Sequence, residues 1–276
     1  RRAGPTSGTP GRRALQNLLL EAAGRRGAEG ILAVVREHGV ALGPVSAATA
    51  VHRLAKALRY SPEERRRRGL AELRGPLLAA LPELRAQGLA NGVWALATLH
   101  CEDEELLSGF FAAATSQLLS LRGRHLSNVA WALATLRRRP EDLLAALSGE
   151  IARRASALNP QSLSNIVWSY ATLYEWDTQV FESVGRGSLV ATLEFSPRDL
   201  ANTLWAFSVY PERGAWHAPL FTALALASRR RAASLPPQDL TSIVWAFAEE
   251  RHGLRPGRAA GGSRYSWAGS AFERVE

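Results

Sequence analysis

The sequence predicts an all-α fold: an α-solenoid, that is, a superhelix of helix-turn-helix repeats with a period of about 37 residues. The first observation is spacing, because 37 residues separate Trp94, Trp131, Trp168 and Trp205 in turn, and Trp245 follows after 40. The second is the recurring segment around each: LANGVWALATL (89–99), LSNVAWALATL (126–136), LSNIVWSYATL (163–173), LANTLWAFSVY (200–210) and LTSIVWAFAEE (240–250). The third is that no segment alternates apolar and polar residues as a strand would.

Residues 1–30 precede the expected array and form a basic segment, rich in Gly and Arg, that we expect to be flexible. Its first 14 residues hold four Arg, and no acidic residue occurs before Glu21, which is also typical of a transit peptide. The array is expected over 31–250. It starts with a degenerate repeat at 31–86, in which Arg53 takes the place of the tryptophan, and clear repeats follow from residue 87. Residues 251–276 break the pattern and are expected to form an irregular tail or a truncated repeat.

Each repeat is expected to consist of two helices, A and B. Helix A carries the tryptophan and follows a helix-start signal such as Asn159-Pro160, Ser196-Pro197 or Pro236-Pro237. Proline suits the first turn of a helix because its missing N–H would have no partner there. Helix B fills the remaining residues, as in 103–121 and 140–158, where apolar residues recur at intervals of three and four.

The tryptophans are expected to be structural. With the tryptophan of helix A as position 0, positions −5, −1 and +2 are apolar and share one face of the helix. Position −4 is always small, which leaves room for the indole one turn later. Burying one Trp side chain contributes roughly 4–6 kcal/mol before opposing terms. We therefore interpret Trp94, Trp131, Trp168, Trp205 and Trp245 as wedges between helices.

Position −3 has no simple packing explanation, because it is Asn91, Asn128, Asn165, Asn202 and then Ser242. Asparagine is unfavourable inside a helix unless its amide has a partner. One interpretation, which we favour, is a ladder of hydrogen bonds between repeats. The other places one amide per repeat on the inner surface, where it meets a nucleobase edge or a ribose.

Other helix A positions vary between repeats, as residues that read different bases would. Position −6 is Gly88, His125, Ser162, Asp199 and Asp239, and position −2 is Gly92, Val129, Ile166, Thr203 and Ile243. Position −7 is always long and polar, and it includes Arg124 and Arg198. These positions predict a rim at the start of helix A that contacts RNA, although neutral drift of an exposed surface would vary in the same way.

The net charge of +9 lies entirely in the first third of the chain. Residues 1–88 hold 16 Lys and Arg against 7 Asp and Glu, which leaves 18 of each sign for residues 89–276. Arginine pairs and triplets nevertheless recur near the interhelical turns, at 122 and 124, 137–139, 153 and 154, and 229–231. If these arginines are aligned along one groove, they would contact a phosphate backbone. If they are solvated side chains at helix ends, the helix dipole explains them without a ligand.

Catalytic and metal-binding patterns are absent from the sequence. The glycine-containing segment 185–190 lacks the third glycine of a nucleotide-binding loop, and no strand is expected before it. Cys101 is the single cysteine and has no evident base or ligand partners. We therefore expect no enzyme activity, no cofactor, no metal and no small-molecule substrate. No run of 18 apolar residues occurs, so no membrane span is expected.

The L-x-N-x-x-W-A core at this period, with a start such as PPQDL (236–240), resembles the octotricopeptide and heptatricopeptide repeat proteins. These organellar RNA-binding proteins are related to RAP-domain, FASTK-like and RNA-editing substrate-binding complex repeat proteins. The resemblance covers about residues 31–250. It implies that the A helices line a concave face that binds single-stranded RNA with about one base per repeat. It also implies a mitochondrial or chloroplast location.

Two functions follow from these expectations. The first is non-catalytic, sequence-specific binding of single-stranded RNA in organellar transcript stabilisation, processing or translation. The alternative is a protein–protein scaffold, within an organellar RNA-processing or ribosomal assembly, because α-solenoids bind peptides on the same surface. The neutral charge of residues 89–276 favours the scaffold, whereas the resemblance favours RNA.

Overall fold

The computed structural model describes residues 11–212 and 214–252, and every regular element among them is helical. The protein is an all-α helical-repeat solenoid with twelve α-helices in the described residues. Contacts divide the chain into two units, residues 1–116 and 117–276, each treated separately below. None of the described helices combines the length and hydropathy needed to cross a membrane.

The first unit contains helices α1 to α5: Arg12–His38, Pro44–Leu58, Glu63–Ala80, Ala86–Thr98 and Glu104–Ser116. Helix α2 occupies the place of a helix A and packs between α1 and α4, while α3 packs on α5. The expectation that residues 1–30 are flexible is wrong from Arg12 onward. Leu15 and Leu19 lie one turn apart and are each 1% exposed, and Gln16 Nε2 donates to Thr49 Oγ1 of α2 at 2.9 Å. These contacts anchor α1, which bends at Gly27, where φ is +56°.

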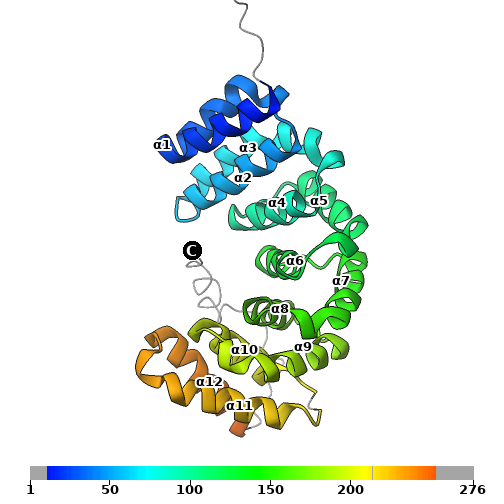
Figure 1. Ribbon diagram of the computed structural model, residues 1–276, viewed down its shortest axis with the longest axis vertical. Coiled ribbons are helices and arrows are strands. Elements are labelled where there is room, and N and C mark those ends of the chain that lie inside the picture. Colours follow the sequence, from blue (N-terminus) through cyan, green and yellow to red (C-terminus); the bar gives the residue numbers. More distant parts are fainter. Residues whose placement is uncertain (1–10, 213, 253–276) are drawn as a thin grey trace, which may run out of the picture. The chain divides into compact units, whose positions relative to one another are not determined.

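The second unit contains helices α6 to α12: Gly123–Leu136, Glu141–Arg154, Pro160–Leu173, Thr178–Ala191, Pro197–Val209, His217–Arg231 and Pro237–His252. The A helices α6, α8, α10 and α12 pack side by side in a row, and the B helices α7, α9 and α11 form a second layer against them (Figure 1). The B helices are shorter than expected. The expected helix over 140–158 ends at Arg154 and continues as a 3-10 turn, Ala155–Ala157.

Three A helices are followed, at the same position of the repeat, by a residue in the left-handed backbone conformation. His100, Arg137 and Tyr174 stand 37 residues apart and have φ of 53°, 54° and 55°. In each case the next N–H donates back into the helix, as Arg138 N does to Leu133 O at 3.0 Å, which satisfies an end carbonyl. Helix α10 departs from this pattern because Pro211 occupies the equivalent position and cannot adopt positive φ. The connection to α11 therefore runs over 210–216, compared with 137–140 and 174–177 in the preceding repeats.

The expected apolar face of helix A is confirmed as core. Positions −5, −1 and +2 are buried in α4, α6, α8 and α10, and the indoles of Trp131, Trp168 and Trp205 are also buried. The terminal helix differs: Leu240 and Val244 of α12, at positions −5 and −1, are 41% and 60% exposed. These residues are buried only where another repeat covers them, so the interface between repeats supplies their burial.

Position −2 faces helix B, and the side chains there compensate in size. A Cβ on Gly92 would lie 2.3 Å from Cε1 of Phe110. In the next two repeats the equivalent pairs are Val129 with Leu147 and Ile166 with Val184, all buried. A smaller residue on one helix accompanies a larger one on the other, so the volume between layers is conserved.

We expect Gly92→Val to destabilise the protein by about 1–3 kcal/mol, because the valine methyls overlap the Phe110 ring. Adding Phe110→Leu, which copies the next repeat, should recover most of this loss. Urea unfolding of the two single variants and the double variant measures the coupling. Strictly additive losses would show that the two positions do not share one space.

Stability should depend on the protonation of His52. Its ring packs edge-on against the Trp94 indole, with centroids 5.1 Å apart, and burial, followed by the charges of Lys56 and Arg53, lowers its pKa to about 4. The unfolded chain protonates His52 near pH 6.5, well before the folded chain does. The free energy of unfolding is therefore unaffected by His52 above about pH 6.5, and it decreases as the pH falls from there towards 4.

The test compares wild type with His52→Leu in urea unfolding between about pH 7 and pH 4.5. The wild type should lose more stability than the variant over this range. If both curves fall in parallel, the titrating groups lie elsewhere.

Candidate nucleic-acid interface

Positions −7, −3, 0 and +4 of the A helices form a stripe that we call the A stripe, in which the indoles of Trp131, Trp168 and Trp205 are buried. In α8 it consists of Gln161, Asn165, Trp168 and Thr172, and the remaining side chains from Ser162 to Leu173 are buried. The equivalents are Arg124, Asn128, Trp131 and Thr135 in α6, Arg198, Asn202, Trp205 and Val209 in α10, Gln238, Ser242, Trp245 and Glu249 in α12, and Gln87, Asn91, Trp94 and Thr98 in α4 of the first unit. The tryptophans thus border the surface that carries the asparagines.

The asparagines at position −3 do not form the expected ladder. Among the described residues, the side-chain amides of Asn91, Asn128 and Asn165 make no hydrogen bond to a neighbouring repeat, and these residues are partly exposed. The side chain of Asn202 is more enclosed, because the residue is 7% exposed, and its Nδ2 has no hydrogen-bond partner within the described part of the chain. Within the described residues these amides, one in the first unit and three in the second, thus make no link between repeats.

The hydrogen bonds that do join neighbouring A helices are made at positions −4, −6 and −7. Ser127 Oγ lies 3.4 Å from Ser162 Oγ, and Ser164 Oγ donates to the Asp199 carbonyl at 3.3 Å. Arg198 Nε donates to Asp239 Oδ1 at 2.8 Å, which links α10 to α12. The small residues at −4 therefore allow close approach of one helix to the next.

The residues at position −6 cap helices and contact neighbouring helices. They do not form the exposed rim that was expected to contact RNA. His125, Ser162, Asp199 and Asp239 are all buried. Asp199 accepts from Ser196 N and Oγ in a capping box, and His125 Nδ1 accepts from Arg122 N. Burial, then Arg124 and Arg122, lowers the pKa of His125. Gly88 is partly exposed but has no side chain.

The candidates at position −2 were wrong as base contacts. Val129, Ile166, Thr203 and Ile243 are at most 3% exposed and belong to the layer between A and B helices. A base would have to separate the layers to reach them. Their variation between repeats reflects the compensation in side-chain size described above.

The arginines divide between two edges of the second unit. We call the side where B-to-A connections lie the N-terminal edge, since A helices begin there, and the opposite side the C-terminal edge. Arg137–Arg139 lie at the C-terminal edge, where Arg139 pairs with Glu175 at 2.6 Å. All other second-unit clusters noted in the sequence lie at the N-terminal edge. The clusters therefore do not follow one groove.

Several arginines of the N-terminal edge have structural partners. Arg153 and Arg154 bind Glu150, and the hydrogen bond from Arg153 is the main reason that the pKa of Glu150 is lowered. Arg154 and Arg231 donate to carbonyl groups of the preceding repeat, at Leu121 and Leu193. Arg122, Arg124, Arg229 and Arg230 are exposed and make no ion pair within the described residues, so they remain available to an anionic ligand.

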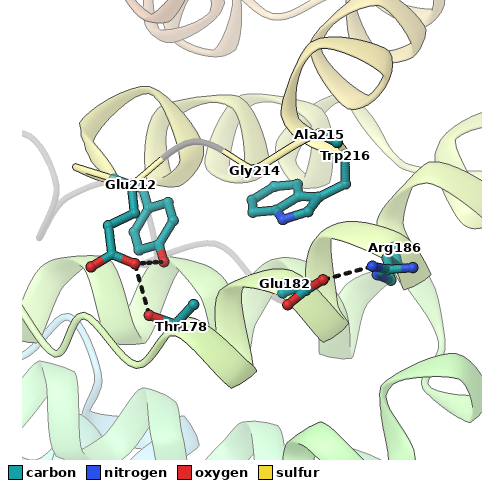
Figure 2. Close-up of a pocket in the computed structure, with 8 residues that line it drawn as sticks. Thr178, Glu182, Arg186, Glu212, Gly214, Ala215 and Trp216 are labelled. Carbon is teal, nitrogen blue, oxygen red and sulfur yellow. Dashed lines mark hydrogen bonds and ion pairs between the residues drawn. The ribbon is translucent and has the colours of Figure 1, made fainter.

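A separate pocket of about 300 Å³ opens at the C-terminal edge, between α9 and the connection 210–216. Figure 2 shows the Trp216 indole between Glu212 and the pair formed by Glu182 and Arg186. Glu212 Oε2 accepts from Thr178 Oγ1 at 2.8 Å and Tyr210 Oη at 3.3 Å. Arg186 donates to Glu182 Oε1 at 2.6 Å. Burial, together with the Glu212 carboxylate, raises the pKa of Tyr210.

The pocket depends on glycine and on the longer connection. A Cβ on Gly185 or Gly214 would lie 2.7 Å from the Trp216 indole, so both glycines are needed for the ring to lie where it does. Residues 210–216 exist as a longer connection because Pro211 prevents the usual left-handed end of helix A. Sequence reasoning missed this pocket, although the interval of 40 residues before Trp245 was its signal.

No family model matches the chain, and no curated protein matches it significantly. Among the described residues, no group of three or more His, Cys, Asp and Glu side chains could hold a metal ion.

We expect Asn165→Ala to change the free energy of unfolding by less than about 0.5 kcal/mol, because its amide has no hydrogen-bond partner among the described residues. Asp239→Ala should cost about 1–3 kcal/mol, because it leaves Arg198 without its buried acceptor. Chemical denaturation of both variants checks the contrast. A larger loss for Asn165→Ala than for Asp239→Ala would restore the ladder interpretation.

Proposed function

We propose that the protein binds single-stranded RNA along the A stripe, without catalysis. The bases meet the asparagines at position −3, beside the tryptophans, and the phosphates follow the N-terminal edge. The resemblance to octotricopeptide and heptatricopeptide repeat proteins supports this proposal, and with it a role in organellar RNA metabolism in a mitochondrion or chloroplast.

The observation that carries the proposal is the set of amides at position −3. An asparagine side chain offers a donor and an acceptor, which is what recognition of a base edge needs. Neighbouring A helices pack about 8–10 Å apart, so equivalent amides recur at a spacing suited to one contact per repeat. The unpartnered Nδ2 of Asn202 is a buried donor of the kind that a ligand satisfies.

The N-terminal edge supplies the electrostatic part. The A helices present the positive ends of their dipoles there, and Arg122, Arg124, Arg229 and Arg230 add exposed charge. This local concentration of cations coexists with the neutral total charge of residues 89–276, since a patch does not require a net excess.

An in vitro selection from a random single-stranded RNA pool tests the proposal with the full chain. We expect enrichment of a short motif of about five bases, one per clear repeat. Asn128→Ala and Asn165→Ala should each relax the preference at one position of that motif and leave thermal stability unchanged. Retention of RNA without any enriched motif would contradict sequence-specific binding.

The salt dependence of RNA binding tests the N-terminal edge. The double variant Arg122→Gln/Arg124→Gln should reduce the slope of log K against log salt by about 1.4, because single strands contribute about 0.7 per phosphate contact. Arg139→Gln, which alters the C-terminal edge, is the matched control and should leave the slope unchanged. Equal effects of the two variants would place the phosphates elsewhere.

The alternative is a protein-binding scaffold, supported by the neutral charge of residues 89–276 and by the pocket that opens at the C-terminal edge. The two functions use different edges of the second unit and are not exclusive. If no RNA motif is enriched and salt abolishes the residual RNA binding, the result would favour the scaffold function alone.

A further inference from the structure

We propose that the degenerate first repeat binds a phosphate of the RNA through Arg53 and Lys56 of α2, whereas the clear repeats present a side chain to a base. The inference rests on the proposed RNA binding and deepens it, because it assigns one repeat to the backbone of the strand. Arg53 and Lys56, which we call the α2 cations, lie in the first unit, next to the part of the A stripe that α4 carries.

Helix α2 has no side chain that could read a base at the positions of the A stripe. Its positions −7 and −3 are Ser46 and Ala50, which are 3% and 1% exposed. Arg53 stands at position 0 in place of the tryptophan, and position +4 is Ala57. Both the amide and the indole of the clear repeats are therefore replaced here, and the polar group that α2 offers at the centre of the stripe is a cation.

The α2 cations are exposed and have no partner in the protein. Neither Arg53 nor Lys56 makes a hydrogen bond or an ion pair within residues 11–212 and 214–252. Residues three apart on a helix are neighbours, with about 5–6 Å between their Cβ atoms, so both side chains can reach one phosphate. The helix dipole favours a cation in the last turn, where Lys56 lies. Arg53 precedes that turn, so the dipole does not account for both residues.

The surrounding helices leave the charge of the α2 cations uncompensated. Neither α2 nor α4 contains an aspartate or a glutamate. The two glutamates at the start of α3, Glu63 and Glu64, pair with Arg67 and Arg68 of the same helix at 2.9 Å and 3.1 Å. A phosphate can therefore neutralise the α2 cations without displacing a carboxylate of these helices. A guanidinium suits this contact because its N–H donors match phosphate oxygens in pairs, and an ammonium adds a point charge.

The α2 cations adjoin the stripe of α4. The ring of His52 lies edge-on against the Trp94 indole, with centroids 5.1 Å apart. Burial, followed by the charges of Lys56 and Arg53, lowers the pKa of His52 to about 4, so these charges act on a group that touches Trp94. Helices α2 and α4 pack together, and packed helices lie about 8–10 Å apart. A strand whose base meets Asn91 can therefore place a neighbouring phosphate on α2.

The experiment measures RNA binding to the full chain by fluorescence anisotropy over a range of salt concentrations. The probes are the motif obtained by selection and an oligouridylate of about ten nucleotides. The double variant Arg53→Gln/Lys56→Gln should reduce the slope of log K against log salt by about 0.7 for both probes, because one phosphate contact is lost. Repeated selection with this variant should enrich the wild-type motif, since a phosphate contact carries no base preference.

The matched control is Arg67→Gln/Arg68→Gln, which removes two exposed arginines from α3 of the same unit. It should leave the slope unchanged, and both double variants should keep the melting temperature of the wild type. Extension of the motif by one abasic nucleotide should raise the slope by about 0.7 at one end of the RNA only. This gain should be absent from Arg53→Gln/Lys56→Gln.

A wild-type slope in Arg53→Gln/Lys56→Gln would overturn the phosphate contact. A change in the enriched motif would also overturn it, because the two residues would then read a base. Neither result bears on the base contacts proposed for Asn128 and Asn165. If no motif is enriched, sequence-specific binding fails, and the slope with oligouridylate still decides whether the α2 cations bind a phosphate. Failure of the wild type to bind either probe would overturn both proposals.

Discussion

Burial of each helix A on three sides is the constraint on which the rest of the structure depends. In α4, α6, α8 and α10 the residues at −5, −1, −2 and +2 are buried, and each large apolar side chain among them contributes about 1.5–3 kcal/mol. Small residues at −4 then bring neighbouring A helices together. One narrow stripe is left in contact with solvent, so any ligand of the row must be recognised by the few residue types that this stripe carries.

The sequence predicted the repeat architecture well, because period and apolar face are local signals that recur. The prediction failed at positions where the residue type depends on a contact with another helix. The variation at −2 looked like base reading but follows the size of the facing residue on helix B, as Gly92 and Phe110 show. The polar residues at −6, such as Asp199, are caps and helix contacts. The start of α1 was missed because Leu15 and Leu19 are buried only by tertiary contacts.

The candidate interface stays a prediction. The asparagines at −3 were chosen because packing did not explain them, and the favoured ladder between them is not seen among the described residues, where serine, arginine and aspartate make the links between repeats. The arginines could not be assigned from sequence, because a guanidinium on a neighbouring carbonyl, as Arg154 is, looks identical in sequence to an exposed one. Only the structure separates arginines that hold repeats together from those left for an anion.

The replacement of the left-handed helix end by Pro211 has a consequence for how such a chain can vary. The connection 210–216 is three residues longer than its equivalents, and the helices on either side pack as in the other repeats. Insertions at this edge are therefore tolerated where insertions within a helix would rotate its apolar face out of the core. The connections at this edge can therefore change in length independently of the helical row.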